Sequence, residues 1–351
     1  MANWVQIEKP IVSLSGSTVS ALSRLATWCR RALAFACWAY LTAVLMLWVI
    51  LGYAELWWPA TFLMFAPRWL FTLPLAVLIP GSLYAGWRSV IVVLFAGVVA
   101  CGPVVGFNIP WQRLTTPTPA GPSFRVLTCN MHDTDLEPTL LDNFVLATAP
   151  DIVVVQEWGR SSKSVLRSLE GWHVHTNRHF FLASRYPIRQ AVNLSHESMS
   201  DGAAATRYEL ETPAGIMNVF TLHLATTRDG IYNTIHQNPD GPAEVQENSD
   251  RRRTQSGFVA SQAAPCQESV LILGDFNTPP QSPFFSEIWS PYTDAFTAAG
   301  WGSGYTFLGA KTTVRIDHIL TGSGWACTGC WVGPEVGSPH RPVIADLVVR
   351  K

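Results

Sequence analysis

Residues 269–277 (SVLILGDFN) determine the fold predicted for the C-terminal part of the chain. They form a short apolar run that ends in Gly274 and in two polar residues, Asp275 and Asn277. A short run of apolar residues bounded by turn-forming residues predicts a buried β-strand. Polar residues directly after such a strand predict that the strand end contributes to a site.

Similar apolar runs recur on both sides of this strand. They are residues 124–130 (FRVLTCN), 151–157 (DIVVVQE), 216–224 (IMNVFTLHL) and 314–320 (VRIDHIL). Helices are predicted between them, at residues 139–148 and after Asn248. Strands mixed with helices over about 230 residues predict a single layered α/β domain spanning residues 124–351.

Polar residues of a limited set of types stand at or just after these strand ends. They are Asn130, Glu157, His223, Asp275, Asn277, Asp317, His318 and His340. Carboxylate and amide oxygens are ligands that Mg²⁺ prefers, and imidazoles move protons or bond to phosphoryl groups. Any one of these residues alone is better explained as a solvated strand end, a turn former or a core histidine. The complete ordered set predicts one shared site.

These motifs resemble the endonuclease/exonuclease/phosphatase superfamily, which has the deoxyribonuclease-I-like fold. The resemblance covers residues 124–350, and GDFN followed by IDHI is its most specific part. The other motifs are LTCNMH (127–132), VVVQEW (153–158), LASRYPI (182–188), TLHL (221–224) and GSPHRPVIADL (337–347). The resemblance implies an α/β fold, a four-layer sandwich of two packed mixed β-sheets flanked by helices. It also implies hydrolysis of phosphate esters with Mg²⁺, or alternatively Mn²⁺.

The resemblance also implies roles for individual residues. Glu157 corresponds to the direct metal ligand, and Asn130 to a residue that holds metal-bound water or phosphate. Asp275 corresponds to the group that orients or deprotonates the attacking water. Asn277 and His223 correspond to donors to the phosphoryl oxygens.

A carboxylate–imidazole pair completes the implied set. Asp317 corresponds to the carboxylate that orients and charges His340, which contacts the scissile phosphate. Such a pair keeps the imidazole protonated, and its positive charge stabilises an in-line displacement at phosphorus.

One position departs from the family pattern. The family usually has Asp immediately before the final His, whereas this chain has Pro339 between Ser338 and His340. We expect an active enzyme with one metal and a weaker base. Two alternatives remain: Asp133 or Asp135 fills the vacant place, or the chain is a binding protein without catalytic activity.

The N-terminal third of the chain is a different kind of polypeptide. Residues 1–113 carry seven basic and two acidic side chains, a net charge of +5. The remainder carries 17 basic and 23 acidic side chains, a net charge of −6, and all nine histidines. Only 14% of the whole chain is charged, against roughly 25% in soluble domains. This composition therefore disfavours a disordered or purely soluble protein.

Three apolar runs predict transmembrane helices at residues 32–52, 69–86 and 89–109. The first and third are uncharged runs of 21 residues, enough to cross ~30 Å of hydrocarbon. The second is shorter and contains Pro74 and Pro80, which neighbouring helices can accommodate. The alternative, a secretory signal followed by a buried core, fits less well because two more apolar runs follow the first. A cytoplasmic segment (1–31), a membrane region (32–113) and a linker (114–123) therefore precede the catalytic domain.

The distribution of basic residues predicts the orientation in the cell membrane. Those before the first run or between the second and third are Lys9, Arg24, Arg30, Arg31 and Arg88. Arg68 and Arg113 fall on the opposite side. The positive-inside rule then places the N-terminus in the cytoplasm and the catalytic domain outside it.

This architecture resembles a bacterial subgroup that includes the glycopeptide (vancomycin/teicoplanin) resistance membrane proteins, which act on undecaprenyl pyrophosphate. The resemblance also rests on Arg228 with Gly230, and on the spacing of Asn248, Arg252 and Gln255. Arg228 and Arg252 are therefore predicted to bind substrate. His132, two residues after Asn130 at a position that varies in the family, is predicted to line the same pocket, with an ordinary loop histidine as the alternative.

A lipid-linked phosphate is the substrate that we expect first. A domain with a net charge of −6 offers little of the basic surface that a nuclease needs. An extracytoplasmic nuclease is the second expectation, and a membrane-tethered binding protein is the third.

Cys327 and Cys330 form a lone C-x-x-C without two further zinc ligands of similar spacing, and the sequence leaves their disulfide state open.

Overall fold

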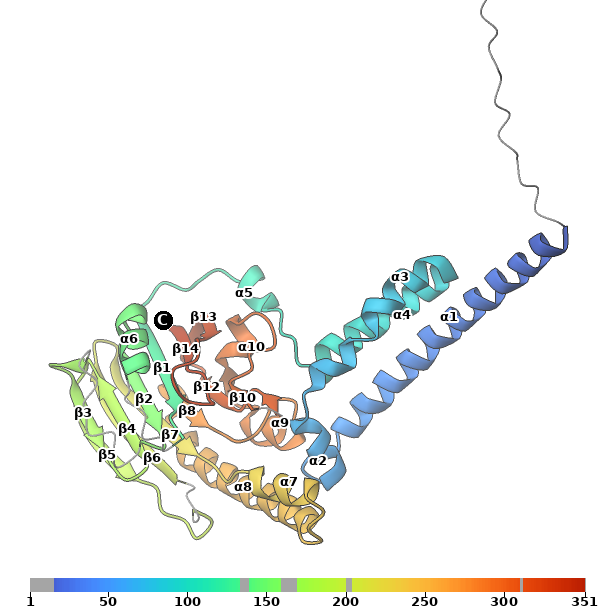
Figure 1. Cartoon of the computed structure of the whole chain (residues 1–351). Coiled ribbons are helices and arrows are strands. Elements are labelled where there is room, and N and C mark those ends of the chain that lie inside the picture. Colours follow the sequence, from blue (N-terminus) through green and yellow to red (C-terminus); the bar gives the residue numbers. More distant parts are fainter. Residues whose placement is uncertain (1–15, 133–138, 159–168, 200–203, 310–311, 351) are drawn as a thin grey trace, which may run out of the picture. The chain divides into compact units, whose positions relative to one another are not determined.

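The computed structural model describes residues 16–132, 139–158, 169–199, 204–309 and 312–350 (Figure 1). The chain divides into two compact units. The first comprises Met1–Met46 and Phe71–Ala100, and the second comprises Leu47–Leu70 and Cys101–Lys351. The boundary expected before residue 124 therefore falls inside the second unit, which also takes in a segment of the expected membrane region.

Three helical stretches are long enough and apolar enough to cross a membrane, as the sequence predicts. They are Ser20–Leu51, Arg68–Ala85 and Trp87–Val104. They comprise most of α1 (Gly16–Leu51), the helices α3 (Leu75–Ala85) and α4 (Trp87–Val99), the 3-10 helix η1 (Arg68–Thr72) and the π-helix η2 (Ala100–Val104). The third stretch ends before the expected residue 109. Beyond it, the backbone N–H of Asn108 donates to the carbonyl of Gly302, so the chain is already part of the second unit there.

Two mixed sheets of six strands form the body of the second unit, as predicted. The first has the order β13 (Trp325–Val332), β14 (Val343–Val349), β1 (Ser123–Asn130), β2 (Ile152–Gln156), β4 (Phe180–Ser184), β3 (His173–Thr176). The second has the order β5 (Ile188–Asn193), β6 (Ala204–Thr212), β7 (Gly215–His223), β8 (Val270–Asp275), β12 (Asp317–Thr321), β9 (Thr293–Asp294). A separate two-stranded ribbon pairs β10 (Phe307–Leu308) with β11 (Thr313–Val314).

Both faces of each sheet carry apolar side chains, so the inner faces of the two sheets pack against each other and helices cover the outer faces. Val126 and Val154 of the first sheet share an inner core with Val219 and Leu271 of the second. The outer face of the first sheet is covered by α6 (Thr139–Thr148), the helix expected at these residues. Helices α8 (Gly241–Ala263) and α9 (Pro283–Trp289) cover the outer face of the second sheet (Figure 1).

The remaining helices are short. They are α2 (Trp58–Phe65), α5 (Trp111–Thr115), α7 (Arg228–Ile235), η4 (Ala264–Cys266) and α10 (Ala295–Ala299). Both α2 and α7 contact α8. Gly230 permits this approach of α7, because a Cβ there would collide with the backbone of Val245. The R-x-G spacing thus has a packing explanation.

A parallel pair of strands lies inside each sheet and positions the site. β1 runs parallel to β2, and β7 runs parallel to β8. His223 and Asp275 are register partners at the carboxyl ends of β7 and β8. Gly274 has a φ of 138°, and a Cβ there would collide with the carbonyl of Leu222. Only glycine therefore lets β8 approach β7 so closely just before Asp275.

Candidate active site

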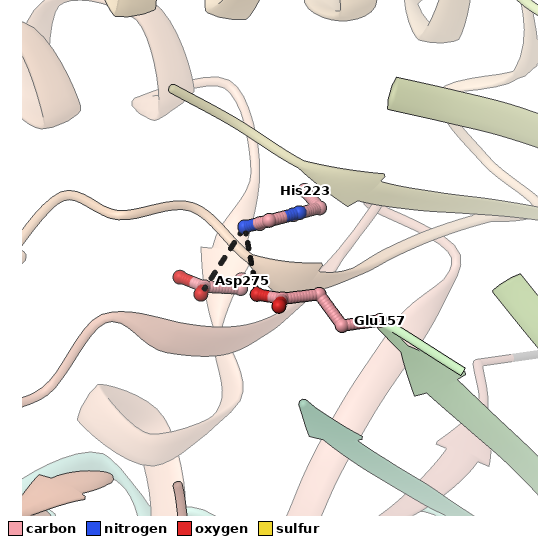
Figure 2. Close-up of side chains that lie close together, drawn as sticks. All are labelled: Glu157, His223 and Asp275. Atoms are coloured by element: carbon pink, nitrogen blue, oxygen red, sulfur yellow. Dashed lines mark ion pairs between the residues drawn. The ribbon is translucent and has the colours of Figure 1, made fainter. Parts of the chain in front are cut away.

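Two carboxylates and an imidazole at the ends of three different strands point at one another (Figure 2). His223 Nε2 lies 3.3 Å from Glu157 Oε1 and 3.8 Å from Asp275 Oδ2. Glu157 follows the last residue of β2, in the first sheet, whereas His223 and Asp275 end strands of the second. The packing of the two sheets therefore brings together residues that the sequence places at separate strand ends.

Asn130 connects the two carboxylates. Its Nδ2 donates to Glu157 Oε1 at 2.8 Å and to Asp275 Oδ2 at 3.0 Å. Its Oδ1 accepts the backbone N–H of His132 at 2.8 Å, and only an oxygen can accept there. The amide orientation is thus fixed, with nitrogen toward the carboxylates. Asn130 lies at the site as expected, and in this arrangement its Nδ2 faces both carboxylates.

Asp317 and His340 form the expected pair. His340 Nδ1 lies 2.9 Å from Asp317 Oδ2, and both residues are buried. Burial by itself lowers the pKa of His340. The negative charge of Asp317 and the hydrogen bond to it outweigh burial and raise that pKa to about 9. His340 is therefore an imidazolium at neutral pH, and its Nε2 lies 3.8 Å from Asp275 Oδ2.

Asp275 is the most central of these residues and has a shifted pKa. Burial, together with the charge of Asp317, raises its pKa to about 6, although His340, His223 and the N–H of Asn277 act in the opposite direction. A carboxylate with a pKa close to neutral is suited to accept a proton from water.

Three residues of the site adopt the left-handed backbone region, which non-glycine residues seldom occupy. The φ angles are 57° at His132, 49° at Glu157 and 48° at Asn277. Such conformations cost roughly 1–3 kcal/mol each and persist where the surroundings impose them. Asn277 shows how: its backbone N–H donates to Asp275 Oδ1 and its Nδ2 to the carbonyl of Leu224, both at 2.8 Å. The bend after β8 is thereby locked.

The loop that carries His340 is fixed to the first sheet and to the β10–β11 ribbon. Ser338 donates to the carbonyl of Asn130 at 2.6 Å and accepts the N–H of His340. Pro339 accepts the N–H of Leu308 through its carbonyl. The proline side chain is not among the described residues that line the site pocket. Asp133 and Asp135, which could replace the missing carboxylate, lie outside the described residues.

Sequence reasoning missed two residues that orient the Asp317–His340 pair. Thr306 is fully buried, its hydroxyl accepts the N–H of Asp317, and its carbonyl accepts the N–H of Arg341. Phe307 places its ring edge-on to His340, with ring centroids 4.9 Å apart. Neither residue ends a predicted strand, so no local pattern marks them.

A pocket of about 750 Å³ opens over this cluster. Its polar lining includes Glu157, His223, Asp275, Asn277 and His340. Arg228, which is predicted to bind substrate, and His132 line the same pocket, and Arg228 Nη1 lies 3.0 Å from His132 Nε2.

The structure does not bring Arg252 to the pocket. Its side chain is 1% exposed and pairs with Glu55, also 1% exposed, at 3.1 Å. Its Nη1 donates to the carbonyl of Ala225, while Gln255 Oε1 accepts the N–H of the same residue. The Arg252 and Gln255 spacing therefore fixes the loop that follows His223.

His318 points away from the site, as expected for a neighbour of Asp317 on one strand. Its Nε2 lies 3.0 Å from the carbonyl of Thr278, and its ring contacts Phe276 and Phe285. Burial lowers its pKa to about 4, so it is neutral. Cys327 and Cys330 are free thiols.

The donor set fits a divalent cation. One ligand atom each from Glu157, His223 and Asp275 lie within 4.8 Å of one another. Two carboxylates at this distance repel each other, and hard oxygen donors of this kind suit Mg²⁺ or Mn²⁺. Asp317 and His340 form a second such group with Asp275, but the two are already hydrogen-bonded to each other.

The model of the endonuclease/exonuclease/phosphatase family matches residues 127–340. None of the curated proteins compared with the chain matches it. Among solved structures, truncated TDP2 from Caenorhabditis elegans is 15% identical with a TM-score of 0.51, covering 65% of this chain and 98% of that one. A family protein from Bacteroides thetaiotaomicron is 15% identical with a TM-score of 0.51, covering 66% and 97%.

A third similar structure is the 3′ phosphatase NExo from Neisseria, bound to a product DNA hairpin. It is 17% identical with a TM-score of 0.50, covering 63% of this chain and 98% of that one. At these identities the likeness concerns the fold, which is the two-sheet sandwich flanked by helices described above.

Proposed function

Because the chain belongs to the endonuclease/exonuclease/phosphatase family and is accordingly a hydrolase of phosphate ester bonds, we propose that it cleaves a lipid-linked phosphate ester or pyrophosphate at a membrane. The observation that carries the proposal is the meeting of Glu157, His223, Asp275 and His340 in one pocket. These side chains supply a cation site, a base and a positive charge within reach of one phosphoryl group.

The geometry supports a distinct role for each group. Glu157, with His223 and Asp275 beside it, would hold Mg²⁺, which when bound neutralises charge on the phosphoryl oxygens. Asp275 accepts the proton of the attacking water, because its pKa of about 6 leaves it deprotonated at neutral pH. The His340 imidazolium, charged by Asp317, faces the negative charge that develops in the transition state.

Two further groups position the substrate in this proposal. Arg228 is exposed at the pocket and presents a guanidinium suited to a phosphate, with His132 beside it. Asn277 lines the pocket, although its Nδ2 already donates to the carbonyl of Leu224. A contribution of Asn277 to phosphate binding would use the second hydrogen of that nitrogen.

The membrane attachment favours a substrate that is itself in the bilayer. Three stretches of the N-terminal region are long and apolar enough to span, while the net charge beyond residue 113 is −6. Nucleic acids need a basic surface that releases counterions, so a lipid phosphate is favoured over DNA or RNA. The bias of basic residues supports a cytoplasmic N-terminus and an extracytoplasmic catalytic domain.

A reporter enzyme fused to the C-terminus tests the topology. A reporter that is active only outside the cytoplasm supports it, and so does proteolytic removal of the catalytic domain from intact spheroplasts. Protection of that domain would contradict the three-span topology.

A phosphate-release screen of the purified full-length protein tests the activity. Lipid pyrophosphates, phospholipids and DNA are compared with and without Mg²⁺, using Glu157→Gln as the matched inactive control. We expect Mg²⁺-dependent turnover of a lipid phosphate. Turnover of DNA alone, with salt-sensitive binding, would make the protein a nuclease. Binding without turnover of any substrate would make it a tethered binding protein.

A further inference from the structure

Part of the lining of the site pocket is apolar, and a segment far from the catalytic motifs contributes to it. Phe65 of α2 lines the pocket, as do Ile231, Tyr232 and Ile235 of α7. Tyr232 is 60% exposed and Ile235 is 38% exposed. The phosphate chemistry proposed above needs none of these side chains, so they require another explanation.

The segment that carries Phe65 is built into the catalytic unit. Glu55 precedes α2 and forms the buried ion pair with Arg252 of α8, and its carbonyl accepts Gln246 Nε2 at 2.9 Å. Beyond α2, Arg68 is buried and donates to Gln281 Oε1 at 3.1 Å. Phe65 is thus fixed at the pocket from both sides of its helix.

Chain connectivity places the same segment next to the bilayer. Only residues 52–57 lie between the stretch Ser20–Leu51 and α2. Only residues 66–67 lie between α2 and the stretch Arg68–Ala85. Trp57, Trp58 and Trp69 flank α2 and are exposed. Tryptophans at the ends of spanning helices favour the membrane–water interface. If both stretches span, α2 lies at the membrane surface, and so does the pocket wall to which it contributes.

We propose that Phe65, Ile231, Tyr232 and Ile235 form a binding site for the hydrocarbon chain of the substrate, directly beside the phosphate site. This inference rests on the proposed function and names the part of the substrate that determines specificity. The chain enters from the bilayer side, past α2, while its phosphate reaches Glu157 and His340. Burial of the first carbons of the chain against this wall then contributes to substrate affinity.

A series of n-alkyl phosphates of increasing length tests the inference. Full-length protein in neutral detergent with Mg²⁺ hydrolyses butyl, hexyl, octyl and decyl phosphate, and phosphate release gives kcat/KM for each. We expect kcat/KM to rise along the series by up to roughly fourfold per methylene that becomes buried, until the wall is covered. The corresponding alkyl p-nitrophenyl diesters repeat the series for a diesterase.

Ile235→Asp is the decisive variant, and Ile216→Asp is its matched control. Both isoleucines are 38% exposed, but Ile216 does not line the pocket. Ile235→Asp should lower the ratio of decyl to butyl kcat/KM at least about tenfold, whereas Ile216→Asp keeps the wild-type ratio. Partitioning of decyl phosphate into detergent is the same for every variant, so a changed ratio reports on the protein.

The outcomes separate this inference from the proposed function. Hydrolysis of all the alkyl phosphates without dependence on chain length would overturn the inference and leave the phosphoesterase function in place. An equal ratio in Ile235→Asp and Ile216→Asp would also overturn it. No hydrolysis of the monoesters, the diesters or the corresponding n-alkyl pyrophosphates with either Mg²⁺ or Mn²⁺ would overturn the proposed function, and the inference with it.

Discussion

Replacing Arg252 by methionine distinguishes the two roles that sequence and structure assign to this residue. The spacing after the His223 strand predicts a substrate-binding arginine. The structure instead buries it against Glu55, with both side chains 1% exposed and 3.1 Å apart. A substrate-binding role predicts a change in KM, and a buried pair predicts a change in stability.

The burial of the pair sets the size of the expected effect. Removing one partner of a buried ion pair leaves an uncompensated charge and costs about 3–5 kcal/mol. At roughly 3 °C per kcal/mol for a domain of this size, Arg252→Met should lower Tm by about 12 °C. Glu55→Gln should lower the free energy of unfolding by at least as much, because the buried arginine that it leaves without a partner has no neutral form.

Thermal unfolding in detergent, followed by tryptophan fluorescence, measures these shifts. Arg253→Met is the matched control, because Arg253 pairs with Glu287 at 2.7 Å but both side chains are about half exposed. That exposed pair should contribute less than about 1 kcal/mol. The double variant Glu55→Gln/Arg252→Met should recover much of the loss, since it leaves no unpaired charge. An unchanged Tm with a raised KM in Arg252→Met would refute the buried-pair account.

The remaining predictions concern the catalytic groups. Glu157→Gln should lower Mg²⁺-dependent turnover by about 10²-fold or more, while Tm stays near that of the wild type. A wild-type dependence of turnover on Mg²⁺ concentration would show that Glu157 is not a ligand. Asp275→Asn should lower kcat by a similar factor through loss of the base, measured at saturating Mg²⁺. In the wild type, kcat/KM should rise as pH passes about 6, where Asp275 loses its proton, and fall as pH passes about 9, where His340 loses its proton. Asp317→Asn should shift the alkaline fall of kcat/KM to lower pH, because burial lowers the pKa of His340 and the charge of Asp317 no longer opposes this effect. An unshifted alkaline fall would assign it to a group other than His340. Pro339→Asp should raise turnover or tighten Mg²⁺ dependence by roughly 1–3 kcal/mol, about five- to a hundredfold, if the missing carboxylate limits the natural protein; equal or slower turnover would favour a site that already has its full charge.

The sequence by itself determined five strands of the sandwich, β1, β2, β7, β8 and β12, and the polar residues at their ends. Each strand is a short apolar run closed by turn residues, and this pattern is local, so it can be read without knowledge of the fold. The same holds for helix Thr139–Thr148 and for the three apolar stretches.

Only the tertiary structure decided which polar groups meet, and in what orientation. Arg252 and Glu55 lie 197 positions apart in the chain, and no periodic pattern connects them. The orientation of the Asn130 amide follows from the backbone of His132, and the contribution of Phe65 to the pocket follows from the packing of α2 on α8. Sequence periodicity reports how far a residue is buried, but the identity of its partner depends on long-range packing. For this reason the sequence located the catalytic strand ends but assigned Arg252 to the substrate.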